Sequence, residues 1–74
     1  MKSYSAVAYE KTKIKVFDTS TGQQICVINT GLTLLNQPIV NNEIVSVLCQ
    51  LSIGRVQNRV YKIPSGSLVR SLDI

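Results

Sequence analysis

Three lysines on one predicted strand are the residues of this 74-residue chain whose spacing is most suited to chemistry. Lys11, Lys13 and Lys15 alternate with uncharged residues, so the pleat of a strand places their ammonium groups on one face. Such a stripe could bind phosphates or carboxylates, and Arg59 is a candidate fourth cation of the same anion-binding surface. The other interpretation is a solvated outer strand whose lysines discourage edge-to-edge aggregation. We favour this second interpretation, because no aromatic residues interleave with the lysines to stack bases.

The overall charge agrees with a mild preference for anionic partners. Eight basic residues against four acidic ones give a formal net charge of +4. A nucleic acid or an acidic protein surface would suit this balance. Solubility alone also accounts for it, because a soluble surface needs some net charge. The charge therefore leaves nucleic-acid binding open without requiring it.

Catalytic constellations are missing from the composition. The chain has no histidine, so none of its serines has the usual activating base, and there is no GxSxG motif. The four acidic residues fall at predicted strand ends or turns, without a spacing that suggests a shared acid and base: Glu10, Asp18, Glu43 and Asp73. No glycine-rich phosphate loop is present. We expect a protein that is not an enzyme, with no catalytic residue and no cofactor.

The two cysteines and the start of the chain indicate a reducing compartment. Cys26 and Cys49 are 23 residues apart, without CxxC spacing, and there is no histidine to complete a zinc shell. We expect both to be buried free thiols and expect no metal site. The first residues lack the apolar core of a signal peptide, and no stretch approaches the 18 apolar residues that span a bilayer. We expect synthesis in the cytoplasm and no membrane association.

The elements that must position these residues are strands. Short runs rich in valine, isoleucine and tyrosine recur between turn signals, and no window has sustained helical periodicity. The fold class is therefore all-β and antiparallel, with seven short strands predicted at Tyr4–Glu10, Thr12–Asp18, Gln23–Asn29, Pro38–Val40, Ile44–Leu51, Arg55–Ile63 and Ser67–Asp73. The long connection, Thr30–Gln37, contains Leu32, Leu34 and Leu35, so we expect it to lie against an apolar surface.

Three turns have specific signals. In the segment from Asp18 to Gly22, the aspartate can accept a backbone hydrogen bond, and the glycine supplies the positive φ of a turn with a glycine bulge. A similar turn ends at Gly66, with Pro64 expected at its second position. Asn41-Asn42 predicts a further tight turn, because asparagine tolerates the left-handed region.

The two glycine turns belong to an internal repeat with an offset of 44 residues. Lys15-Val16-Phe17 aligns with Arg59-Val60-Tyr61, Ser20-Thr21-Gly22 with Pro64-Ser65-Gly66, and Ile25 with Val69. Period and strand count are those of a propeller blade. The stretch Arg59–Val69 and its weaker partner Lys15–Ile25 resemble the outer strands of WD-repeat and quinoprotein-like propeller blades, and Gln37–Val47 looks like the innermost strand, a tight turn and a second strand.

This resemblance implies one domain, residues 1–74, made of roughly two blades. Blade-like repeat 1 spans 4–29, the connection spans 30–37, and blade-like repeat 2 spans 38–73. Two blades do not close a propeller, because each blade buries both faces against neighbours. Both faces of several strands are apolar, above all in the nearly continuous apolar run from Ile44 to Leu51. We therefore expect a homo-oligomeric ring, with a trimer of six blades preferred over a dimer or a tetramer.

The function expected from these features is structural. We predict a non-enzymatic structural or binding protein that forms a propeller-like ring and contacts other proteins of a larger assembly, for instance as a decoration or tail component of a phage virion. One alternative is a small oligomeric lectin-like recognition module. Another is a monomeric basic small β-barrel that binds nucleic acid through the lysine stripe.

Overall fold

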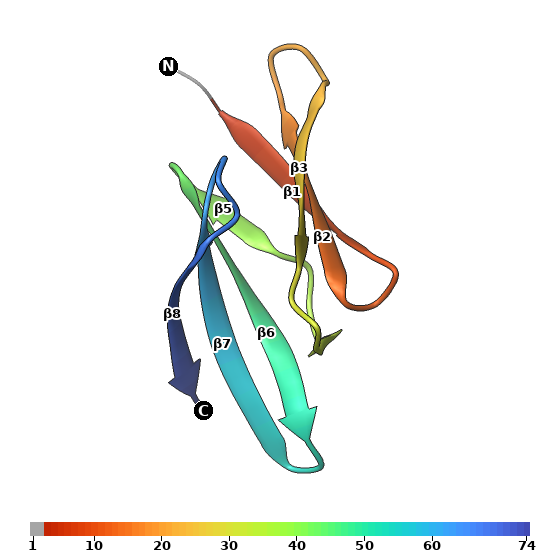
Figure 1. The fold of residues 1–74 in the computed structure, drawn as a ribbon, viewed down its shortest axis with the longest axis vertical. Coiled ribbons are helices and arrows are strands. Elements are labelled where there is room, and N and C mark those ends of the chain that lie inside the picture. Colours follow the sequence, from red (N-terminus) through yellow and green to blue (C-terminus); the bar gives the residue numbers. More distant parts are fainter. Residues whose placement is uncertain (1–2) are drawn as a thin grey trace.

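The computed structural model describes residues 3–74, which form two antiparallel β-sheets (Figure 1). The first sheet has the strand order β1–β2–β3, with bounds β1 Tyr4–Tyr9, β2 Lys13–Asp18 and β3 Gln24–Asn29. The second sheet has the order β4–β6–β7–β8, and β5 pairs with another part of β6. Its bounds are β4 Thr33–Leu34, β5 Ile39–Asn41, β6 Ile44–Ser52, β7 Arg55–Lys62 and β8 Leu68–Asp73.

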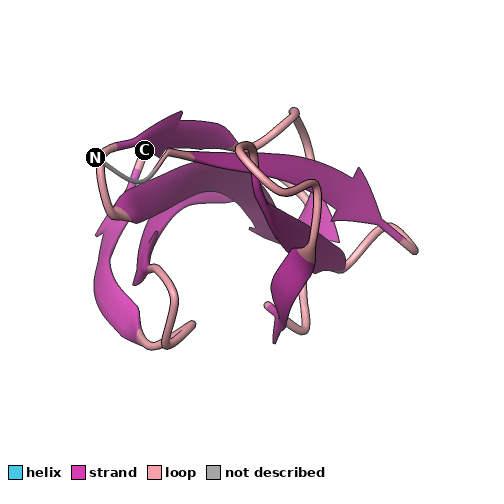
Figure 2. Cartoon of the chain, turned by 90° about the horizontal axis from the view of Figure 1, so that it is seen from above, coloured by secondary structure: helices cyan, strands magenta, loops and turns pink. Residues whose placement is uncertain are grey.

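The all-β, antiparallel fold class is confirmed, with no helix in the described part of the chain. Seen from above, the strands follow a curve and do not form a flat stack (Figure 2). Residues 3–74 close into neither a barrel nor a propeller. The predicted seven strands all form, with ends that differ from the expected ones by no more than one residue.

The eighth strand, β4, lies inside the segment predicted to be a plain connection, and that prediction was wrong. Thr33 and Leu34 pair with Gln50 and Cys49 of β6. A strand of two residues has no periodicity of its own, so only the distant partner strand defines it. Leu34 packs against the core as expected, and so does the neighbouring Leu32. Leu35 does not, because 46% of it is exposed.

The predicted glycine turns form. The Asp18 carboxylate accepts a hydrogen bond of 2.9 Å from the Ser20 N–H, and Gly22 has a φ of +74°. Gly66 has a φ of +77°. Pro64 lies at the third position of its turn, one place later than expected, after a cis peptide bond. Asn42, with a φ of +56°, confirms the tight turn between β5 and β6.

The backbone hydrogen bonds of these two turns repeat at the offset of 44 residues found in the sequence. The N–H of Gly22 donates to the carbonyl of Asp18, and the N–H of Gly66 donates to the carbonyl of Lys62, both at 2.7 Å. A register shift also recurs 44 residues later, between Val16 and Phe17 in β2 and between Val60 and Tyr61 in β7. We call β1–β2–β3 the first unit and β6–β7–β8 the second unit.

Each unit has two faces, because side chains alternate across a strand. In each unit we call the first strand (β1 or β6) the inner strand, the second (β2 or β7) the middle strand and the third (β3 or β8) the outer strand. The strand pairings place the even-numbered residues of the inner strand, the middle strand and the centre of the outer strand on one face, and the odd-numbered residues on the other. The offset in the middle and outer strands is even, so equivalent residues keep the same parity. We call these two surfaces the even face and the odd face of each unit.

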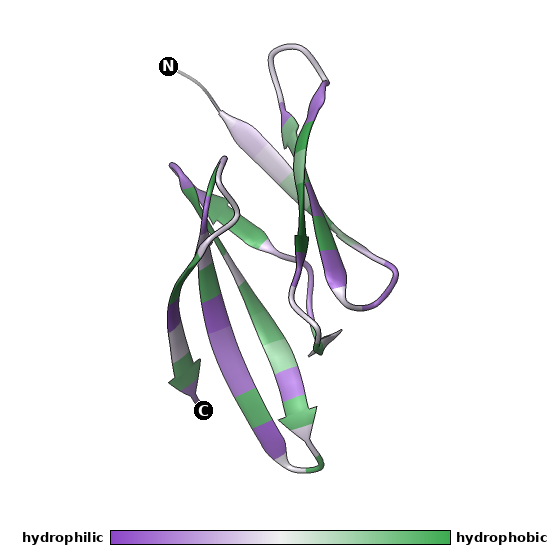
Figure 3. Ribbon diagram, in the orientation of Figure 1, coloured by the Kyte–Doolittle hydropathy of each residue, from purple (hydrophilic) through white to green (hydrophobic). Residues whose placement is uncertain are grey.

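The core lies between the two sheets and uses opposite faces of the two units. The first unit buries its even face through Ile14, Val16 and Ile28. The second unit buries its odd face, together with the start of the following turn, through Val45, Val47, Cys49, Tyr61 and Ile63. Hydropathy follows this arrangement: β6 is largely apolar along its length, whereas β7 has a polar middle (Figure 3). Within residues 3–74, each unit therefore has one of its faces covered and the other open.

Candidate interaction surfaces

The hairpin turn between β1 and β2 determines where the predicted lysines lie. Glu10 and Lys11 have left-handed backbone conformations, with φ of +50° and +65°, and the N–H of Thr12 donates to the Glu10 carbonyl at 2.8 Å. Lys11 is thus an exposed turn residue that lies outside the strand. Lys13 and Lys15 follow in β2 on the odd face of the first unit.

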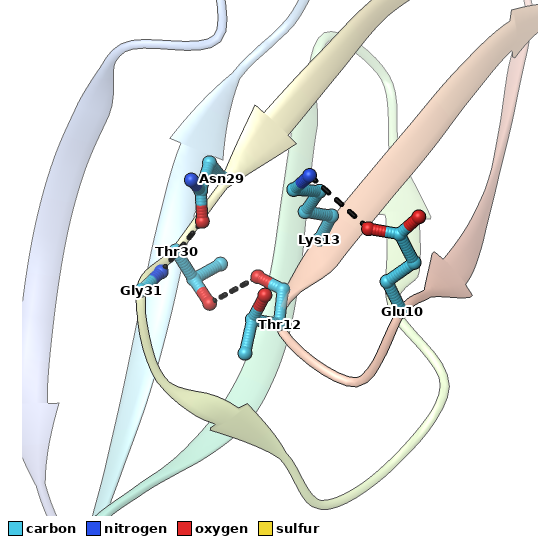
Figure 4. A network of polar contacts seen from close by, with 6 residues as sticks. All are labelled: Glu10, Thr12, Lys13, Asn29, Thr30 and Gly31. Carbon is cyan, nitrogen blue, oxygen red and sulfur yellow. Dashed lines mark hydrogen bonds and ion pairs between the residues drawn. The ribbon is translucent and has the colours of Figure 1, made fainter.

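Lys13 and Lys15 each have a partner on the protein. The Nζ of Lys13 lies 3.2 Å from Oε2 of Glu10 (Figure 4). The Nζ of Lys15 lies 3.9 Å from the centre of the Tyr9 ring. Hydrogen bonds from Tyr9 and then Lys13 hold the pKa of the Glu10 carboxyl below its usual value, and the bond with Glu10 raises the pKa of Tyr9. We call Tyr9, Glu10, Lys13 and Lys15 the lysine cluster.

Tyr9 is the residue of this cluster that the sequence analysis missed. No aromatic residue interleaves with Lys11, Lys13 and Lys15, but Phe17 follows Lys15 on the same face of β2, and the pairing of Tyr9 with Lys13 brings a second aromatic ring from the neighbouring strand. Cross-strand neighbours on one face of a sheet lie within reach of long side chains. The strands Tyr4–Glu10 and Thr12–Asp18 were predicted with one residue between them, so antiparallel pairing of these two strands was the signal that would have found Tyr9.

Arg59 lies elsewhere, and the structure does not bring it to the lysine cluster. It is on the odd face of the second unit, which is covered by the first sheet. Its Nη1 donates to the Thr30 carbonyl and to the Tyr61 hydroxyl, both at 3.3 Å, and its Nε donates to Oε1 of Gln57 at 2.9 Å. Arg59 and Lys15 hold equivalent positions, but among the described residues the face that carries Arg59 is covered and the face that carries Lys15 is open.

A polar network links the end of β3 to the first hairpin (Figure 4). The buried Thr30 hydroxyl lies 2.6 Å from the Thr12 carbonyl and 3.0 Å from the Leu32 carbonyl. The side-chain carbonyl of Asn29 accepts a bond of 3.0 Å from the Gly31 N–H. These bonds satisfy the backbone groups where the chain leaves the first sheet, and they direct it towards β4.

The two thiols differ in their surroundings. Cys49 is fully buried beside this network, and burial raises the pKa of its thiol, an effect that Arg59 and Thr30 partly offset. Cys26 is half-buried, and desolvation raises the pKa of its thiol too. Burial is therefore confirmed for Cys49 and only partly for Cys26. Thiols with raised pKa values are poor nucleophiles at neutral pH.

Two sheet faces remain open, one on each unit. The odd face of the first unit exposes Val7 and Val27, each at 44%, beside the lysine cluster. The even face of the second unit exposes Ile44 at 40% and Leu72 at 50%, and β5 adds Ile39 at 62% next to Ser46 of β6. Exposed apolar side chains on a sheet face, here interleaved with charged ones such as Lys15 between Val7 and Val27, are compatible with an interaction surface.

Within residues 3–74, no three His, Cys, Asp or Glu side chains gather in a way that could hold a metal ion. The same residues include no helix of the length and apolar character needed to cross a membrane. In comparisons with known proteins, no family model, no curated protein and no solved structure matches this chain.

Proposed function

We propose that this protein is a non-enzymatic structural component that assembles with copies of itself into a propeller-like ring within a larger assembly, such as a phage virion. The observation that carries the proposal is the unequal use of the two faces of a repeated unit. The turn hydrogen bond and the register shift of the middle strand recur in both units, yet the described residues bury the even face of the first unit and the odd face of the second. The open face of the first unit is the odd face, which is covered in the second unit, and the open face of the second unit is the even face, which is covered in the first.

The cost of leaving these faces in water supports assembly. Covering apolar surface stabilises by roughly 2.5 kcal/mol for each 100 Å² removed from water. A domain of this size has only about 5 kcal/mol of net stability, so two half-exposed apolar faces are a large burden for an isolated copy. Contact between copies removes that burden without any change in the fold.

Ring closure limits the number of subunits. With two units per chain, a dimer has four units, a trimer six and a tetramer eight, all within the usual range of closed propellers. We favour the trimer, which lies in the middle of this range. A closed ring also avoids the open-ended filament that a head-to-tail contact otherwise produces.

The composition supports a structural role over catalysis. The chain has no histidine, and the pKa of the buried Cys49 thiol is raised, which disfavours the reactive thiolate. The charged side chains best placed to act together, Glu10 and Lys13, form a surface ion pair at a hairpin. Such a pair orders a turn and solubilises the surface.

The decisive experiment is the native mass of the protein over a range of concentrations, by light scattering coupled to size exclusion and by native mass spectrometry. We expect three times the chain mass of 8.2 kDa, with twice or four times this mass also consistent with a ring. High salt should leave the assembly intact, because apolar burial holds it together. A folded 8.2 kDa monomer at high concentration would overturn the proposal.

The lysine cluster favours a second candidate, binding of a nucleic acid by a monomer. Lys13 and Lys15 share a face, and the Tyr9 ring beside them offers a surface on which a base could stack. This candidate competes with assembly, because the cluster lies on the open odd face that a neighbouring copy would cover. It predicts single-strand binding that weakens steeply with salt, measured by fluorescence anisotropy. Salt-insensitive or absent binding would exclude it.

A further inference from the structure

The open even face of the second unit and the open odd face of the first unit correspond in position to the two surfaces that already meet inside the chain, although the even face has Asn58 and Arg70 where the first unit has Ile14 and Cys26. Internally, the even face of the first unit packs on the odd face of the second. Leu72 is the equivalent of the buried Ile28, and Val60 is the equivalent of the buried Val16. Phe17, on the open odd face, is the equivalent of the buried Tyr61. The same kind of contact can therefore recur between two copies.

One internal contact gives this correspondence a definite location. A Cβ built on Gly66 would lie 3.4 Å from Cγ1 of Ile28, so the turn of the second unit rests on a side chain of the first. The equivalent turn at Gly22 has open space around it, with nothing within 4 Å of a built Cβ. Leu72, the equivalent of Ile28, is half-exposed. The two partners of the equivalent contact, the Gly22 turn and Leu72, are thus both exposed within the described chain.

The position of Arg59 explains how lysines can lie on such a surface. Arg59 is half-buried on the face that packs against the first sheet, and it donates to the carbonyl of Thr30, just after β3. Lys15 holds the equivalent position in the first unit. A cation at this position is therefore compatible with a covering sheet, because the strand end of that sheet supplies a backbone acceptor.

We propose that a second copy of this chain covers the open odd face of the first unit with the even face of its own second unit, so that Leu72 of one copy lies against the Gly22 turn of the next. This inference rests on the proposed function and specifies its interface. The contact is head-to-tail, because two different surfaces meet, and its repetition closes the ring. Lys15 then lies under the neighbouring copy, as Arg59 lies under the first sheet.

Two charged variants test this interface, one on each face. Val27→Glu blocks the odd face of the first unit, and Leu72→Glu blocks the even face of the second. Both side chains are half-exposed, so the fold should tolerate the charge. Each variant alone should have a native mass of 8.2 kDa. A mixture of the two should form a 1:1 heterodimer, because it retains one intact interface. Ile53→Glu is the matched control: Ile53 is 98% exposed at the tip of the β6–β7 hairpin, outside both faces, and its variant should assemble like the wild type.

The outcomes separate this inference from the proposed function. A monomeric wild type overturns the proposed function and the interface together. A wild-type oligomer that survives both Val27→Glu and Leu72→Glu overturns the interface alone. If only one of these variants loses assembly, the blocked face contacts the same face of another copy, and this outcome also overturns the proposed interface. A mixture of the two variants that stays at 8.2 kDa overturns the interface as well. Circular dichroism of each variant shows whether it is folded.

A cross-link provides a second measurement that does not depend on disruption. The exposed Thr21 precedes Gly22 in the turn, so Thr21→Cys combined with Leu72→Cys should give disulfide-linked copies under mild oxidation. Chains that carry only one of the two substitutions retain the native Cys26 and Cys49 and serve as controls. We expect a ladder of linked chains for the double variant only. A ladder of the same yield in a single variant, or no linkage in the double variant, overturns the inference.

Discussion

The two units of this protein have the same backbone pattern and different surroundings. Gly22 and Gly66 close their turns with hydrogen bonds of equal length, and both middle strands have the register shift at the equivalent place. Yet Ile28 is 3% exposed and its equivalent Leu72 is 50% exposed. Local sequence therefore determines the hydrogen bonds of a unit, whereas the burial of a face depends on which neighbour lies against it.

The same comparison holds for charged residues. Lys15 faces outward over Tyr9, whereas Arg59 lies against the first sheet and donates to Thr30. A basic side chain is thus available for anion binding at position 15, whereas the basic side chain at the equivalent position 59 bonds to the segment that follows the first sheet. The function of a cation in this chain thus follows from the face it occupies.

The largest expected effect is the difference between Ile28→Ala and Leu72→Ala. We expect Ile28→Ala to lower the free energy of unfolding by about 2–5 kcal/mol, because it leaves a cavity in the core. Leu72→Ala should cost less than about 1 kcal/mol at low protein concentration, with a loss that grows with concentration if copies assemble. Urea unfolding followed by circular dichroism measures both. Equal losses at low concentration would show that the two faces are not used differently.

A smaller loss is expected for Thr30→Val at the junction that follows the first unit. The substitution removes the hydroxyl, whose single hydrogen is best placed for the Thr12 carbonyl at 2.6 Å and whose oxygen accepts from the Leu32 N–H at 3.2 Å, so both half-buried backbone groups lose this partner. We expect a loss of about 1–3 kcal/mol in urea unfolding. Thr33→Val, at an exposed position of β4, is the matched control and should change stability by no more than about 0.5 kcal/mol. Similar losses of stability for both variants would show that the Thr30 hydrogen bonds do not stabilise the fold.

The glycine turns should respond alike, since they share one backbone conformation. Gly22→Ala and Gly66→Ala each place a side chain at a φ above +70° and should each cost about 1–2 kcal/mol. Asparagine tolerates this conformation better, so Gly22→Asn should lose less than Gly22→Ala, whereas Gly66→Asn places further atoms beside Ile28 and should recover less. Thermal unfolding monitors all four. A much larger loss at one turn than at the other would break the equivalence of the two units.

The smallest effect concerns the hairpin of the first unit, which has an ion pair where the second unit has Ile53 and Gly54. The pKa of Glu10 is lowered from its usual 4.5, first by the hydrogen bond from Tyr9 and then by Lys13. A lowered carboxyl pKa stabilises the fold above its unfolded-state value, and this contribution is lost as the pH falls through the folded-state value. Tyr9→Phe and Lys13→Ala should both raise the pKa of Glu10, as measured by NMR titration. An unchanged titration in both variants would show that these contacts do not form in solution.

Much of the secondary structure was predictable, because it depends on local patterns. The alternation of side chains located seven strands to within one residue at either end, and Gly22, Asn42 and Gly66 marked turns that need a positive φ. The lysine stripe was partly predictable for the same reason: Lys13 and Lys15 share a face, as alternation along one strand requires. Lys11 does not share this face, because it belongs to the hairpin turn that precedes β2.

Features that depend on distant partners escaped prediction. β4 exists through its pairing with Cys49 and Gln50, and the ring of Tyr9 reaches Lys15 through strand pairing. Arg59 was grouped with the lysines on chemical type alone, although its position in the second unit places it on the covered face. In each case the deciding neighbour is far along the chain or on another strand, where periodicity holds no information.

The amino-acid sequence alone determined that this chain is all-β, where its strands and turns lie, and that its two halves repeat at 44 residues, because alternation and turn chemistry act between near neighbours. Only the tertiary structure decided which face of each unit is buried. Both faces carry apolar side chains, so the choice depends on how the two sheets stack. That stacking buries Ile28 of the first unit and Cys49 of the second, and it leaves Val27 of the first unit and Leu72 of the second half-exposed.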